Sequence, residues 1–258
     1  MRDSRIKWRV NLKPRFTVLT FGEYMAADDG PRETMLRDMR YERLARTLIY
    51  RHLRTTISRF LASPTRDRGI LADCRRLLED ERSGATSAQQ RENLTYEIRA
   101  LEAFENSLNA LGMGGLNFEL AAAAPPLRVE GVSISVQPTA HVRVSRPRGV
   151  DLIGAVVIDT AKGESPKTEV AKIKIADGMA HSAILLHKYV ARAFPGKDPR
   201  PSAEHCFVFH AHRQERVCAP DPYRRTYRNM EAVCRNIARS WEAIPEPANF
   251  DPAFAEYR

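Results

Sequence analysis

Apolar residues in the first 112 positions recur at the spacing of helices. In the segment 31–61, which has a proline at its start and another soon after its end, they fall on one helical face, formed by Ile49, Leu53, Ile57 and Phe60. The same spacing predicts two further helices over 69–81 and 88–111, the second ended by a glycine-rich turn.

Beyond residue 126 the hydrophobic period changes to two. Val132, Ile134 and Val136 alternate with polar residues, as in a half-buried strand, whereas the nearly continuous apolar run 152–159 predicts a central strand. The predicted strands are 132–137 with its continuation 140–144, then 152–159, 169–175, 206–210 and 215–219, and the predicted helices are 176–194 and 224–243.

The order of these elements predicts an α+β or α/β protein. An N-terminal helical region precedes a small mixed sheet flanked by helices. We expect a mostly helical region over 1–115, a sheet-and-helix domain over 116–245 and a polar tail over 246–258.

Composition narrows the class of protein. Of the 258 residues, 43% are hydrophobic and 28% charged, which is ordinary for a folded chain and too apolar for a disordered one. The longest apolar runs are shorter than the roughly 20 residues of a membrane helix, and the first fifteen residues lack a signal-peptide pattern. The four cysteines form no close pair, so we expect reduced thiols and a cytoplasmic location.

The net charge of +9 is compatible with a polyanionic partner. Only eight of the 41 basic residues are lysines, a bias that a GC-rich genome also produces. The segment 32–59 holds eight arginines against three acids, and beside Tyr41 and Tyr50 these suit phosphate contacts. The candidate DNA-binding residues are Arg37, Arg40, Arg43, Arg46, Arg51 and Arg54. The alternative is a solvated helix face.

A second group of arginines lies in the predicted helix 224–243, close to Tyr223 and Tyr227. Because Glu231 and Glu242 interrupt this group, the sequence favours a solvated helix face there.

The element order resembles the core of the PD-(D/E)XK nuclease superfamily, of the RecB-exonuclease kind. The chain is also similar to a family of bacterial proteins without an established activity. That similarity is carried by RFTVLTFGEY at 15–24, the Arg-rich helix after it, VSISVQP at 132–138, GAV at 154–156, AK at 161–162 and EAVCRNIARSW at 231–241. The resemblance implies a restriction-endonuclease-like fold.

In that superfamily an acid at one strand end and an acid and a lysine two residues apart on the next strand hold Mg²⁺ and activate water. At the first position, after Pro138, this chain has Thr139, and on the next strand Asp159 and Lys162 lie three residues apart. This departure puts metal binding in doubt.

A second assignment combines Asp159 with Glu169 and Lys172 across a turn. Asp159 and Glu169 would bind the metal, and Asp151 would be a further carboxylate. Glu169 and Lys172 fall on opposite faces of a regular strand, so this scheme needs a bulge. The alternative is that Asp159, Glu169, Lys172 and Lys174 are ordinary hairpin and surface residues.

Other kinds of site find less support. Cys206, His210, His212 and Cys218 could face one another on two strands, but their spacing is not that of a zinc site, and we expect no metal cluster. The chain has no G-x-S-x-G motif and no phosphate-binding loop, which argues against a nucleoside triphosphate partner.

The sequence therefore predicts a nucleic-acid-interacting protein on a nuclease-like scaffold without efficient catalysis and without a cofactor. One alternative is an active Mg²⁺-dependent DNase. Another is a non-enzymatic module whose helical half binds a protein partner.

Overall fold

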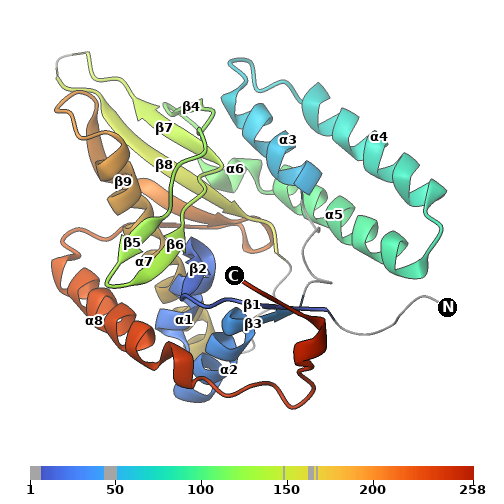
Figure 1. Cartoon of the computed structure of the whole chain (residues 1–258). Coiled ribbons are helices and arrows are strands. Elements are labelled where there is room, and N and C mark those ends of the chain that lie inside the picture. The colour runs from blue at the N-terminus through green and yellow to red at the C-terminus, as the bar shows by residue number, and fades with distance from the viewer. Residues whose placement is uncertain (1–6, 44–50, 148, 162–165, 167) are drawn as a thin grey trace.

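The computed structural model describes residues 7–43, 51–147, 149–161, 166 and 168–258 (Figure 1). The fold is α+β, as the sequence predicts, with small mixed sheets flanked by helices. The helices are α1 (Val18–Ala26), α2 (Asp29–Arg40), α3 (Arg51–Ala62), α4 (Gly69–Gly84), α5 (Ala88–Asn106), α6 (Leu108–Leu111), α7 (Glu169–Ala193) and α8 (Arg224–Ser240). Within the described ranges, every helix is too short or too polar to pass through a lipid bilayer.

The described strands form three sheets. The largest has the order β10-β9-β8-β7-β4, and the two smaller ones have the orders β2-β6-β5 and β11-β1-β3. The strands are β1 (Trp8–Val10), β2 (Arg15–Thr17), β3 (Tyr41–Arg43), β4 (Asn117–Glu119), β5 (Leu127–Val129), β6 (Val132–Ser135), β7 (Ala140–Val144), β8 (Leu152–Asp159), β9 (Arg200–His210), β10 (Glu215–Cys218) and β11 (Ala255–Tyr257).

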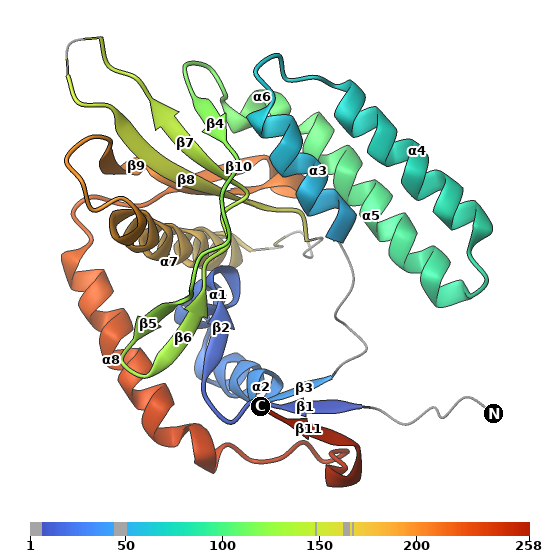
Figure 2. The ribbon, with the colours of Figure 1, turned by 45° about the horizontal axis from the view of Figure 1, so that its top comes forward.

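Strand β8 confirms the prediction of a buried central strand over 152–159. It pairs antiparallel with β7 and parallel with β9, and α7 connects the two parallel strands. Figure 2 shows α7 on one face of the sheet and the helices α3 to α5 on the other. Alternate residues therefore enter two cores: Val157 packs on the α7 side, while Val156 packs with Phe207 on the α5 side. Because both faces are covered, the strand is apolar almost throughout.

Helices α1 and α7 cross at very short range. A Cβ atom at Gly22 would lie 2.1 Å from Ser182 Oγ and 2.3 Å from the carbonyl oxygen of Gly178. The Ser182 hydroxyl bridges the two helices, since it is 3.0 Å from the carbonyl oxygens of both Val18 and Gly178. Glycine at position 22 thus lets α1 lie directly on α7, beside the end of β8.

The helix predicted over 31–61 is wrong in its middle. Helix α2 ends at Arg40, and Tyr41–Arg43 forms β3, which pairs antiparallel with β1. Tyr41 is buried there, with its ring 4.9 Å from that of Phe250. Tertiary pairing therefore overrides the local helical pattern.

The strand predicted over 169–175 is also wrong, because α7 begins at Glu169. Thr168 caps this helix by accepting a hydrogen bond from the backbone N–H of Ala171. Val170 and Ile173 are both exposed, so the apolar residues of this segment do not form the buried face of a strand.

The predicted strand 132–137 and its continuation 140–144 belong to two different sheets, and part of the predicted tail 246–258 joins a third sheet. Val132–Ser135 forms β6 in one sheet and Ala140–Val144 forms β7 in another, with Pro138 between them. In the segment 246–258, β11 pairs parallel with β1 near the start of the chain, and Phe250 packs on Trp8. By contrast, the predicted helices 69–81, 88–111 and 224–243 are confirmed by α4, by α5 with α6, and by α8.

Candidate functional site

A pocket that carries several ionisable side chains on an otherwise apolar lining lies at the carboxyl end of β8. Asp159 is the last residue of β8 and stands in register with His210, the last residue of β9. Glu23 of α1 and Arg213 of the turn after β9 line the same cavity, which has a volume of about 250 Å³. We call this cavity the Asp159 pocket.

Burial, together with the repulsion between the Glu23 and Asp159 carboxylates, shifts the pKa values of the groups in the Asp159 pocket. Burial raises the pKa of the Glu23 carboxyl and the nearby Asp159 carboxylate raises it further, while Arg213 opposes both effects. Burial lowers the pKa of His210, against the attraction of Asp159. The buried Nδ1 atom of His210 has no hydrogen-bond partner in the described part of the chain. The Asp159 pocket thus brings two carboxyl groups and a buried histidine ring together.

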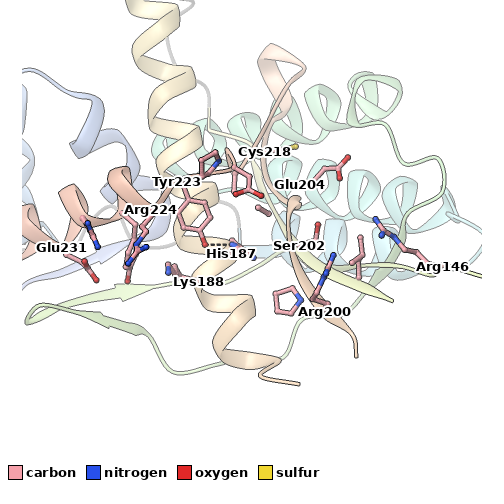
Figure 3. A pocket seen from close by; sticks show the side chains of 18 residues that line it. Arg146, His187, Lys188, Arg200, Ser202, Glu204, Cys218, Tyr223, Arg224 and Glu231 are labelled. Carbon is pink, nitrogen blue, oxygen red and sulfur yellow. Dashed lines mark hydrogen bonds between the residues drawn. The ribbon is translucent and has the colours of Figure 1, made fainter. Parts of the chain in front are cut away.

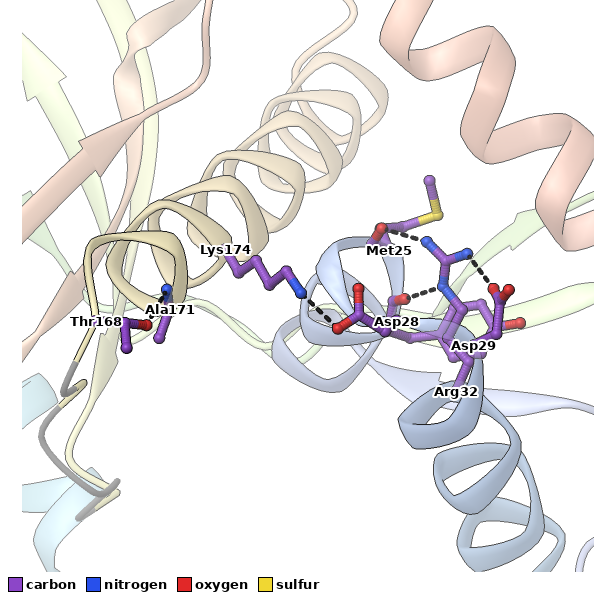
Figure 4. Close-up of polar contacts among 8 residues, drawn as sticks. Met25, Asp28, Asp29, Arg32, Thr168, Ala171 and Lys174 are labelled. Atoms are coloured by element: carbon purple, nitrogen blue, oxygen red, sulfur yellow. Dashed lines mark hydrogen bonds and ion pairs between the residues drawn. The ribbon is translucent and has the colours of Figure 1, made fainter.

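Polar contacts between α1, α2 and α7 fix one wall of the Asp159 pocket (Figure 4). Lys174 of α7 lines the pocket but forms an ion pair with Asp28, before the start of α2. Arg32 donates hydrogen bonds to the carbonyl oxygens of Tyr24 (3.0 Å) and Met25 (2.8 Å), at the end of α1. These contacts hold the helix that carries Glu23.

Thr139, where the nuclease resemblance calls for an acid, has a structural contact. Its buried hydroxyl accepts a hydrogen bond of 2.9 Å from the backbone N–H of Ile158, and its own N–H donates to the carbonyl oxygen of Val156 at 2.7 Å. Thr139 therefore ties the start of β7 to β8 and supplies no charge.

The other predicted acids lie away from Asp159. Asp151 precedes the opposite end of β8, about 26 Å away for eight extended residues, and accepts a hydrogen bond from the N–H of Arg146. Glu169 and Lys172 form an exposed ion pair of 3.1 Å in the first turn of α7, and neither lines the Asp159 pocket. The strand arrangement predicted for Glu169 and Lys172 beside Asp159 is wrong, because the segment that carries them is the start of α7.

The cysteine and histidine residues of the rival site do not form a metal centre that we can recognise. The rings of His210 and His212 lie 6.3 Å apart, and all four cysteines are free thiols. Burial raises the pKa of Cys206 to about 12. Among the described residues, no group of three His, Cys, Asp or Glu side chains has the geometry of a metal site.

The predicted DNA-binding arginines are dispersed. Arg40 donates to the carbonyl oxygen of Trp241 and so links the N-terminal part of the chain to the C-terminal part, whereas Arg43 stacks on Trp8. Arg37 is half-buried on α2. Arg54 donates to the carbonyl oxygen of Gln137 at 2.6 Å. Arg46 and the side chain of Arg51 lie outside the described residues.

A different set of basic residues gathers on the small sheet β2-β6-β5. Arg15, Ser133 and Arg128 stand side by side in register across its three strands, and both arginines are exposed. With Lys13 and Arg258 they line a hollow of about 910 Å³, whose described lining contains no Asp or Glu. We call this hollow the basic groove.

The basic groove continues toward the Asp159 pocket. Ser135 and Gln137 belong both to the groove and to a smaller cavity lined by Arg54 and Thr139. Leu19 in turn lines both that cavity and the Asp159 pocket. The sequence alone does not reveal the groove, because its cations come from three segments that are far apart in the chain. The sequence does not reveal Glu23 either, because that residue lies in a helix that was not predicted.

Comparisons with known proteins add no assignment. No protein-family model matches the chain, and no curated protein matches its sequence.

Proposed function

We propose that this protein binds nucleic acid along the basic groove, on a nuclease-like scaffold that has little or no catalytic activity. The observation that carries the proposal is the row Arg15–Ser133–Arg128 in a hollow without described acidic side chains. Two exposed guanidinium groups on either side of a hydroxyl suit successive phosphates of a strand.

The arrangement around β8 supports the nuclease-like part of the proposal. An antiparallel strand, β7, and a parallel strand, β9, lie on either side of β8, and Asp159 lies at its carboxyl end, where the PD-(D/E)XK superfamily places its second acid. Thr139 replaces the first acid, which argues against efficient catalysis. Lys162, the other residue of that pattern, lies outside the described residues.

A fluorescence-anisotropy titration tests the binding proposal. We expect a 3′-labelled oligonucleotide to bind with an affinity that falls steeply with salt, because bound cations displace condensed counterions. The double variant Arg15→Gln/Arg128→Gln should weaken binding about tenfold or more, and its logarithmic salt slope should be smaller by roughly 1.5. Arg99→Gln, which removes an exposed charge on α5, is the matched control. Unchanged affinity in the double variant would exclude the basic groove as the nucleic-acid-binding surface.

A second candidate function is a Mg²⁺-dependent DNase. It is favoured by the carboxyl groups of Glu23 and Asp159, which line one pocket. Burial raises the pKa of Glu23, and the nearby Asp159 carboxylate raises it further. Oxygen ligands of this kind fit Mg²⁺, which would activate a water molecule there. Glu23 and Asp159 would hold the ion, while His210 would accept or donate a proton.

Calorimetry separates this candidate from the first. An active centre requires Mg²⁺ binding that Glu23→Gln weakens, together with cleavage that EDTA abolishes and Asp159→Ala removes. If millimolar Mg²⁺ does not bind and DNA is not cut, the DNase function is excluded, while groove-dependent binding is unaffected.

A further inference from the structure

A second large cavity lies at the opposite end of the central sheet. It has a volume of about 990 Å³ and lies where β9 begins, where β10 ends and where α7 and α8 face each other (Figure 3). Arg200, the first residue of β9, pairs with Leu152 at the start of β8, whereas Asp159 is at the other end of that strand. This cavity, which we call the tyrosine pocket, shares no residue with the basic groove or the Asp159 pocket.

The tyrosine pocket has a surplus of unpaired positive charge. Its lining contains five cations and three carboxylates, which are Arg146, Lys188, Arg200, Arg224 and Arg228 against Glu204, Asp221 and Glu231. In the part of the chain that the structure describes, none of the five cations forms an ion pair. Figure 3 shows Arg146 and Arg200 on the side of the sheet and Lys188 and Arg224 on the side of the helices.

A hydrogen bond fixes the aromatic wall of the tyrosine pocket. Burial raises the pKa of Tyr223 to about 12, so its hydroxyl stays protonated, and a hydrogen bond of 2.6 Å joins this hydroxyl to Nδ1 of His187. Burial also lowers the pKa of His187, which favours the neutral form of the ring. The ammonium group of Lys188 lies 5.5 Å from the ring centre of Tyr223 and 4.3 Å from that of Tyr227. The lysine is therefore held in place by two rings rather than by a carboxylate.

From this geometry we infer that the tyrosine pocket binds a phosphate monoester carried on a sugar, as in a nucleoside monophosphate or the 5′-phosphorylated end of an oligonucleotide. A phosphate monoester carries a charge of about −1.5 to −2 near neutral pH, which matches the surplus of two positive charges. Guanidinium groups bind its oxygen atoms in pairs. The three carboxylates accept hydrogen bonds from sugar hydroxyls.

Calorimetric titration of the full chain tests this inference. We expect adenosine monophosphate to bind and adenosine not to bind, because the charge of the phosphate supplies the attraction. Arg200→Gln/Arg224→Gln should weaken the binding about tenfold or more. Arg225→Gln should leave the affinity unchanged, since Arg225 is exposed on α8 beside Arg224 but does not line the tyrosine pocket. Equal binding of adenosine and its monophosphate by the wild-type protein would overturn the inference, even if the double variant fails to fold.

Oligonucleotides with and without a 5′-phosphate distinguish the two sources of the ligand. A preference for the 5′-phosphorylated strand that is lost in Arg200→Gln/Arg224→Gln supports the end of a strand as the source, and binding of the free nucleotide alone supports the monomer. If neither binds in a way that depends on Arg200 and Arg224, the inference is wrong. The variant Arg15→Gln/Arg128→Gln should keep the phosphate preference, so a failure here is distinguishable from a failure of the basic groove.

Discussion

Asp159 and His210 stand side by side at the ends of the parallel strands β8 and β9. Their side chains point to the α7 face of the sheet, where both line the Asp159 pocket with Glu23. The acid and the histidine are thus neighbours through the register of two strands, although a whole helix, α7, separates them along the chain.

Histidine protonation should make the stability of the protein depend on pH. Burial lowers the pKa of His210 below its ordinary value of 6.5, so the unfolded chain binds the proton more readily than the folded one. The contribution of His210 to the free energy of unfolding is therefore complete above about pH 6.5. As the pH drops from there through the folded pKa, the free energy of unfolding falls by up to about 1.4 kcal/mol per pH unit. Urea titrations between pH 5 and 8 measure this slope, and His210→Gln should reduce it. An unchanged slope in that variant would contradict the assignment to His210.

The close crossing of α1 and α7 predicts that Gly22→Ala destabilises the protein. The added methyl group would overlap Ser182 Oγ and the backbone of Gly178, at a cost of about 1–3 kcal/mol. Gly30→Ala is the matched control, because that helical glycine has open space around it, and it should leave stability unchanged or slightly raised. Chemical denaturation compares the two, and equal stabilities would contradict the packing described here.

Glu169 and Lys172 should be dispensable for nucleic-acid binding and for any cleavage. They form an exposed pair three residues apart in the first turn of α7, which contributes only about 0.2–0.5 kcal/mol to stability. Glu169→Ala and Lys172→Ala should therefore behave like the wild-type protein in the anisotropy and cleavage assays. Loss of function in either variant would show that this helical turn approaches the ligand.

Thr139 should contribute to stability through its hydroxyl. In Thr139→Val the partly buried N–H of Ile158 loses its acceptor, which costs about 1–3 kcal/mol. Thr139→Ser keeps the oxygen atom and should lose less. The comparison of their unfolding midpoints in urea tests this order, and a valine variant as stable as the serine variant would show that the hydrogen bond contributes little.

Part of the fold was predictable from the sequence because it depends on local patterns. Helices α4, α5 and α8 each bury one continuous apolar stripe, and β8 is apolar because both of its faces are covered. In these elements the period of the hydrophobic residues and the burial of the side chains agree.

The candidate site was less predictable, although Asp159 itself was identified. Its predicted partners, Glu169 and Lys172, were placed on a strand over 169–175. The capping hydroxyl of Thr168 starts a helix at that point instead. The residue that does join Asp159 is Glu23, from a short helix near the start of the chain.

The sequence by itself determined which segments are helices or strands wherever one local face is buried, and that the chain carries a surplus of arginine. Only the tertiary structure decided which charges meet. Gly22 brings Glu23 to Asp159 through a helix crossing, and strand register aligns Arg15 with Arg128 across β6. The physical reason is that periodicity reports the burial of a single element, whereas a site depends on contacts between elements that are far apart in the chain.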